Sequence, residues 1–202
     1  IASPNNPTGT MLEPERLAEI AAECRRLGLW LVSDEIYHGL TYEGDAPTAL
    51  AAGDDIFVIQ SFSKYFQMTG WRLGWMVVPE RYARDIEKLA QNLFISPSTP
   101  AQYGALAAFA PETIGILEQR REEFRRRRDF LAPALADIGF KLTAQPQGAF
   151  YIYADCSALT DDSDRFARNL LEAEGVAVTP GLDFGAHSPK RHLRFAYTTD
   201  IA

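Results

Sequence analysis

Short apolar runs that alternate with helical patterns constrain the fold of this chain more than any other feature. The runs "LWLVS", "DIFVIQS" and "LGWMVVP", which begin at residues 29, 55 and 73, have the length and composition of buried strands. Before the first run, "EPERLAEIAAECRRLG" repeats its apolar residues at helical spacing, and Gly28 marks the end of that helix. This alternation predicts an α/β fold with a mostly parallel sheet.

A second pattern begins in the middle of the chain. Helices are predicted over residues 80–92 and 99–110, and a longer one over "PETIGILEQRREEFRRRRDFLAPALADIG". Beyond it, the strand pair in "FKLTAQPQGAFYIYADC", a helix over 163–174 and the strands in "GVAVTPG" and "RHLRFAYTT" predict a smaller α+β unit. We place the domain boundary near residue 118, so that 1–118 is part of a large domain and 119–202 is a small C-terminal domain.

Composition and charge exclude several classes of function. The chain is 47% hydrophobic and 23% charged, as expected of a folded globular protein, and its net charge of -7 argues against nucleic acid as a partner. No apolar run is long enough to span a membrane and "IASPNNPTGT" is no signal peptide, so we expect a cytoplasmic protein. Cys24 and Cys156, which we expect to be buried thiols, and the three histidines lack the spacing of a metal site. The arginines of "RREEFRRRR" follow glutamates at helical spacing and are predicted to be solvated ion pairs.

Polar residues follow two of the predicted strands. Asp34 comes after the first and Ser61 ends the second, and in parallel sheets ligands bind beyond the carboxyl ends of the strands. In "SFSKYFQMTGWRLGW", Lys64 lies between a pair of serines and Arg72. The position of Lys64 between two hydroxyl side chains and an arginine indicates a chemical role for this lysine.

Three separated motifs carry a resemblance to a known family. In chain order, "SPNNPTG", "SDEIYHGLTYEG" and "SFSKYFQMTGWRLGW" resemble the signature segments of the class I/II aminotransferases, which are fold-type I enzymes that use pyridoxal phosphate. "PQGAFYIYADC", "GVAVTPGLDFG" and "HLRFAYTTD" resemble the small domain of that family. The resemblance therefore implies a partial cofactor-binding large domain followed by a small C-terminal domain.

The resemblance assigns cofactor contacts to particular residues. Asp34 matches the carboxylate that keeps the ring nitrogen protonated, and Asn6 and Tyr37 match the donors to the phenolic oxygen. Ile36 would lie against one face of the ring. Lys64 matches the lysine that forms the Schiff base and then moves a proton at the substrate α-carbon.

The same resemblance covers the charged groups of cofactor and substrate. Ser61, Ser63 and Arg72 match the residues that bind the cofactor phosphate. Arg194 matches the arginine that binds the substrate α-carboxylate, with Asn6 also in reach, whereas the nearby Arg191 is not assigned. The family also implies a cis bond between Asn6 and Pro7.

The resemblance implies transfer of an amino group from an α-amino acid to a 2-oxo acid, in a homodimer. Two other hypotheses share this fold: a pyridoxal-phosphate-dependent lyase or decarboxylase, and the effector domain of an aminotransferase-like transcription regulator. The family's N-terminal phosphate-binding helix and stacking aromatic have no counterpart in these residues, so we expect the chain to be the carboxyl-terminal portion of a longer protein. The choice of amino acid and 2-oxo acid stays open.

Overall fold

The structure is a computed structural model that describes residues 1–201. The chain divides into two compact units. The first comprises residues 1–4 and 11–121, and the second comprises 5–10 and 122–202. The helix α4, Pro111–Asp137, begins in the first unit and ends in the second. The expected boundary near residue 118, and the roles of the two parts as large and small domain, stay predictions.

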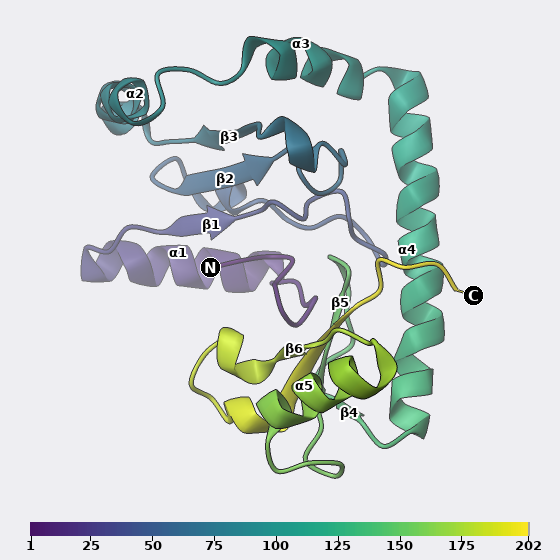
Figure 1. The fold of residues 1–202 in the computed structure, drawn as a ribbon. Helices are drawn as coiled ribbons and strands as arrows, with labels where there is room; N and C mark the ends of the chain where they lie inside the picture. The colour runs from purple at the N-terminus through teal and green to yellow at the C-terminus, as the bar shows by residue number, and fades with distance from the viewer. Residues whose placement is uncertain (202) are drawn as a thin grey trace. The chain divides into compact units, whose positions relative to one another are not determined.

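The first unit contains a three-stranded sheet in the order β1-β2-β3 (Figure 1). The strands are β1 (Val32–Asp34), β2 (Phe57–Ser61) and β3 (Gly74–Val77). β1 and β2 are parallel, with Asp34 opposite Ile59, whereas β2 and β3 are antiparallel, with Ser61 opposite Gly74. An isolated parallel bridge joins Ala2 to Asp34. The sheet is thus mixed, and the carboxyl ends of β1 and β2 lie next to each other.

The helix α1, Pro14–Leu27, packs its apolar stripe onto this sheet. Leu17 and Ala21 are buried against Ile56 and Val58, as their helical spacing predicts. Gly28 ends the helix in the left-handed region, with φ of 66°, where its N–H bonds the carbonyl of Arg25. A short 3₁₀ segment at Ala49–Ala52 covers the same cluster.

The first predicted strand is shorter than expected and begins later. Leu29 and Trp30 of "LWLVS" lie outside β1 and are exposed, and Leu31 is buried. The physical reason is that residues 29–31 connect the end of α1 to the point where the chain begins to pair with β2. Alternation then turns Ser33 toward the core and Val32 away from it.

The first unit also contains two helices and the beginning of a third. They are α2 (Glu80–Leu93), α3 (Thr99–Ala108) and the first turns of α4. Ala101, Ala105 and Ala108 of α3 are buried, and the latter two pack with Phe62 and Met68. The helix ranges agree with the sequence prediction to within a few residues.

The second unit contains a four-stranded antiparallel sheet in the order β4-β5-β7-β6. Its elements are β4 (Lys141–Leu142), β5 (Tyr151–Asp155), α5 (Ser163–Glu174), β6 (Thr179–Pro180) and β7 (His192–Ala196). Ile152 and Leu193 are completely buried in its core. This agrees with the predicted α+β unit.

The arginine run of α4 is less solvated than predicted toward its end, where Arg127 is half-buried and Arg128 is buried. Arg125 and Arg126 pair with glutamates one turn earlier, as the solvated-face prediction requires. Arg128, in contrast, is buried, and its Nη1 donates to the carbonyl of Pro146 at 2.8 Å. A helical periodicity of 3.6 turns this one arginine of the run toward the sheet. Of the cysteines, Cys156 is buried as expected and Cys24 is only half-buried.

Candidate active site

The predicted cofactor residues of the first unit lie at the carboxyl ends of β1 and β2. Asp34 is the last residue of β1 and Ser61 the last of β2. The β1–β2 register places Asp34 opposite Ile59, and Ser61 follows Ile59 by two residues, so both polar side chains belong to one face of the sheet. The fold thereby brings together two residues that are far apart in the sequence.

The loop after β1 carries Ile36 and Tyr37. The Asp34 carboxylate accepts a hydrogen bond from the Ile36 backbone N–H at 3.2 Å, which folds the chain sharply after the strand. Tyr37 is buried, with only 3% of its surface exposed. The Lys64 ammonium nitrogen lies 5.7 Å from the centre of the Tyr37 ring. Lys64 and Tyr37 are therefore neighbours, and Asp34 lies three residues before Tyr37 in the same unit.

Hydrogen bonds join the polar residues of the connection between β2 and β3 to one another. The Ser61 hydroxyl contacts the Ser63 hydroxyl at 2.9 Å and accepts the Ser63 N–H at 3.0 Å. Thr69 donates its hydroxyl to the Ser63 carbonyl at 2.6 Å, and its own carbonyl accepts from Arg72 at 2.8 Å. Arg72 has a positive φ of 52°. Two hydroxyls and one guanidinium thus come from a single short loop.

Tyr65 and Glu118 attach this loop to the first turns of α4. The Tyr65 hydroxyl donates to the Glu118 carboxylate at 2.5 Å, and Glu118 also pairs with Arg121 at 2.7 Å. Burial and the hydrogen bond to Glu118 raise the pKa of Tyr65 to about 12. The residue next to Lys64 is therefore held in place by a helix.

In the second unit, a turn over residues 5–10 holds Asn6. Asn5 accepts from both the N–H and the hydroxyl of Thr8, and the Gly9 carbonyl accepts the N–H groups of Gln147 and Gly148. Gly9 has a φ of 69°, and a Cβ there would lie 2.9 Å from the Gly148 carbonyl oxygen, so only glycine fits. The Asn6–Pro7 bond is cis, as predicted, and the Ser3–Pro4 bond is also cis.

Arg194 on β7 lies beside this turn. Its Nη1 donates to the Asn6 side-chain oxygen at 2.8 Å, and its Nη2 donates to the Thr179 hydroxyl at 3.1 Å. The guanidinium carbon lies 4.2 Å from the centre of the Tyr151 ring and 4.9 Å from that of Phe184. Aromatic faces on the guanidinium and partners on two of its nitrogens orient the group.

The Arg194 Nε atom is buried and has no hydrogen-bond partner among residues 1–201. Buried donors are nearly always paired, so this atom indicates a ligand with an acceptor. A carboxylate suits a guanidinium edge because both are planar and bidentate. Sequence reasoning missed Thr179, Tyr151 and Phe184, although the alternation in "FYIYADC" already places Tyr151 on one face with Tyr153.

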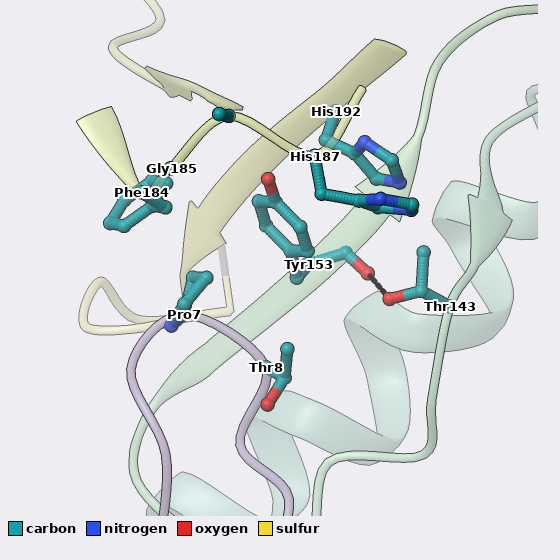
Figure 2. Close-up of a pocket in the computed structure, with 9 residues that line it drawn as sticks. Pro7, Thr8, Thr143, Tyr153, Phe184, Gly185, His187 and His192 are labelled. Carbon is teal, nitrogen blue, oxygen red and sulfur yellow. Dashed lines mark hydrogen bonds between the residues drawn. The ribbon is translucent and has the colours of Figure 1, made fainter. Parts of the chain in front are cut away.

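A cavity of about 440 Å³ lies in the second unit (Figure 2). Tyr153 and His192 stack against each other on one side, with ring centres 4.9 Å apart, and Phe184 lies on another. Pro7 and Phe184, which line this cavity, are neighbours of Asn6 and Arg194. None of the predicted site residues lines the cavity itself.

We tested whether the predicted residues fit pyridoxal phosphate. Asp34 supplies an acceptor for a protonated ring nitrogen, and Ser61, Ser63 and Arg72 supply the hydroxyls and cation that a phosphate requires. Lys64 supplies the amine, and the unpartnered Arg194 Nε supplies a donor for a substrate carboxylate. The side chains of the first unit therefore fit the cofactor, and Arg194 in the second unit fits a carboxylate. In the described part of the chain, no group of three or more metal-binding side chains occurs, and no helix is long and apolar enough to cross a membrane.

Comparisons with known proteins agree with the family that the motifs resemble. Residues 1–201 match the model of the family described as "Aminotransferase class I and II". The valine–pyruvate aminotransferase of Mycobacterium tuberculosis is 44% identical over 199 residues, which cover 98% of this chain and 51% of that protein. The aspartate/prephenate aminotransferase of Thermus thermophilus is 38% identical over 203 residues, which cover 98% and 51%.

Solved structures give the same result. A crystal structure of an aminotransferase from Mycobacterium tuberculosis has a TM-score of 0.94 and 41% identity, and the match covers 99% of this chain and 52% of that chain. The chain thus spans about half the length of the relatives that it matches.

Proposed function

Because the chain belongs to the class I and II aminotransferases, we propose that it is part of an enzyme that moves an amino group from an α-amino acid to a 2-oxo acid, with pyridoxal phosphate bound to Lys64. One observation carries the proposal. Ser61 ends β2, and Ser63, Lys64 and Arg72 lie in the connection that follows it, next to the end of β1 at Asp34. The activity, substrates and partners of the whole protein are part of this proposal.

Asp34, Tyr37 and Ile36 orient the cofactor ring in this proposal. When bound, pyridoxal phosphate supplies an electron-withdrawing ring that stabilises negative charge at the substrate α-carbon. The Asp34 carboxylate would keep a proton on the ring nitrogen, and the Tyr37 hydroxyl would donate to the phenolic oxygen. Ile36 excludes water from one face.

Ser61, Ser63 and Arg72 bind the phosphate. The hydroxyls act as donors and the guanidinium as a fixed bidentate cation. The internal contacts of the loop, through Thr69, support this role because they hold Ser63 and Arg72 close together before any ligand binds. Such preorganisation lowers the entropic cost of binding.

Lys64 has two roles. Its amine would hold the cofactor, and as a free amine it would carry a proton to and from the substrate α-carbon. Proximity to the buried Tyr37 ring supports a defined position for the Lys64 ammonium group.

Arg194 binds the α-carboxylate of the substrate. The orienting contacts from Asn6, Thr179, Tyr151 and Phe184, and the unpartnered Nε, support this role. Asn6 offers its oxygen to Arg194, so its amide N–H groups would face a ligand as donors. A cytoplasmic location and a homodimeric assembly stay predictions.

The test is an absorbance spectrum of the purified chain with added pyridoxal phosphate, followed by borohydride reduction and peptide mapping. We expect a visible band and a reduced label on Lys64. Lys64→Ala should lose both, whereas Lys88→Ala, which changes an exposed lysine paired with Asp85, should keep both. A label spread over several lysines, or equal labelling of the two variants, would contradict the proposal.

A further inference from the structure

Glu35 is a buried carboxylate that the proposed chemistry does not use. It follows Asp34 directly, and only 2% of its surface is exposed. Acidic side chains are almost never fully buried unless they are paired. The contacts of Glu35 therefore indicate what it does.

Four polar groups from three segments of the first unit donate to this carboxylate. Its Oε1 accepts from the Ala49 N–H at 2.7 Å and from the hydroxyls of Ser33 and Thr48 at 3.2 Å each. Its Oε2 accepts from the Gln60 amide at 3.4 Å. These contacts join the end of β1 to the 3₁₀ segment at Ala49–Ala52 and to β2.

His38 extends the network to the start of the chain. Its Nδ1 lies 3.5 Å from the Glu35 Oε2, and its Nε2 lies 3.1 Å from the Ser3 carbonyl oxygen. Because a carbonyl oxygen only accepts, the Nε2 atom carries a hydrogen. Burial lowers the pKa of His38, against the opposing effects of Glu35, the Ser3 carbonyl and Asp45.

The segment that Glu35 anchors is the one that carries the proposed ring contacts. The Glu35 N–H bonds the Ile59 carbonyl, and the Glu35 carbonyl accepts the His38 N–H, each at 2.9 Å. Asp34 precedes this residue, and Ile36 and Tyr37 follow it. Movement of Glu35 would therefore move the ring contacts on both sides.

We propose that Glu35 is a positioning residue, whose hydrogen bonds set the orientation of Asp34 and Tyr37 toward the cofactor ring. This inference rests on the proposed function for the identity of the cofactor. The anchoring itself depends only on contacts within the first unit. Such supporting contacts commonly decide whether a site is held tightly enough to act.

Two substitutions of Glu35 separate hydrogen bonding from simple loss of stability. Glu35→Ala leaves the Ala49 N–H and two hydroxyls without their acceptor. Glu35→Gln keeps an oxygen for these donors and offers an N–H to His38 Nδ1, while Gln60 can turn its amide oxygen inward. The matched control is Leu17→Ala, which removes buried volume from the same unit but no hydrogen bond.

The experiment measures hydrogen exchange and cofactor binding for the parent chain and the three variants. In Glu35→Ala we expect faster exchange concentrated in amides 35–40, about tenfold or more weaker binding of pyridoxal phosphate and a shifted visible band. The affinity of Glu35→Gln for pyridoxal phosphate should stay within about threefold of that of the parent chain. Leu17→Ala should keep the parent band.

The outcomes distinguish this inference from the proposed function. If the parent chain binds no cofactor, the function proposal fails for this chain, and the exchange of amides 35–40 still decides the anchoring. If Glu35→Ala matches Leu17→Ala in exchange pattern and band, the positioning role is overturned. Equal losses in Glu35→Ala and Glu35→Gln would also overturn it, because hydrogen bonding would then not be the cause.

Discussion

At the scale of single residues, the candidate site depends on side chains that are held by their neighbours. Arg194 has partners on two nitrogens and aromatic rings on its faces. Glu35 has a partner for each carboxylate oxygen. Each of these groups would be costly to bury without such contacts.

Arg194→Lys should weaken binding of a carboxylate ligand. A lysine keeps the charge but loses the planar bidentate edge that includes Nε, so we expect the dissociation constant of an amino-acid or dicarboxylate ligand to rise about tenfold or more. Titration of the cofactor-loaded protein with the ligand measures it. Arg191→Lys is the control, since Arg191 pairs with Asp155 and is exposed. Equal effects of the two changes would rule out the assigned role.

Tyr65→Phe should change the alkaline stability profile. The folded-state pKa of about 12 lies above the ordinary value of 10, so the folded state holds the phenol proton more tightly than the unfolded state does. The Tyr65 contribution is therefore fully present below pH 10 and is lost as the pH rises through 12. Urea unfolding of parent and variant across this range should show a stability difference that shrinks with increasing pH. A difference that is constant or grows would contradict the raised pKa.

At the scale of elements, the sequence signals were strongest where a backbone conformation is required. Gly28 ends α1 in the left-handed region, and Gly9 closes the turn that holds Asn6. The helix ranges followed from apolar spacing, and Gly28 marked the end of α1. The strands were less well bounded, because β1 has only three residues and its pairing with β2, not its own composition, decides where it begins.

Two glycine substitutions, one just past the end of α1 and one inside α4, should have opposite effects. Gly28→Ala should destabilise the chain by about 1 kcal/mol, because alanine is strained at a φ of 66° although the space around it is open. Gly115→Ala, inside α4, also has open space but no positive φ, and should stabilise by about 0.5–1 kcal/mol. Urea unfolding midpoints measure both. The explanation fails if the two changes shift the midpoint in the same direction.

At the scale of the whole molecule, several large apolar side chains of the first unit are exposed. Leu93 is 77% exposed and Ile95 is 83% exposed, both near the end of α2, and Leu106 of α3 is 70% exposed. Leu93, Phe94 and Ile95 are consecutive and all exposed, and such apolar stretches promote association. Ile95 also has a positive φ of 68°, which is unfavourable for a β-branched residue.

We therefore expect the chain to associate with itself in a concentration-dependent way. The double change Leu93→Gln and Ile95→Asn should lower this association, and asparagine should also relieve the backbone strain at position 95 because it tolerates a positive φ. Sedimentation velocity over a range of concentrations measures the effect. A parent chain that stays monomeric at every concentration would contradict the prediction, and Lys141→Gln, on strand β4 of the second unit, is the control.

The sequence by itself determined the family, the helix ranges and the identity of the candidate residues, because motifs such as "SFSKYFQMTGWRLGW" combine residue types that one chemistry requires. Only the tertiary structure decided which side chains support them. Glu35, Thr179 and Phe184 are set by strand register and by contacts between segments far apart in the chain. The burial of Arg128 and the late start of β1 were decided in the same way. Apolar spacing records which face of an element is buried, but it does not record the partner that the face meets.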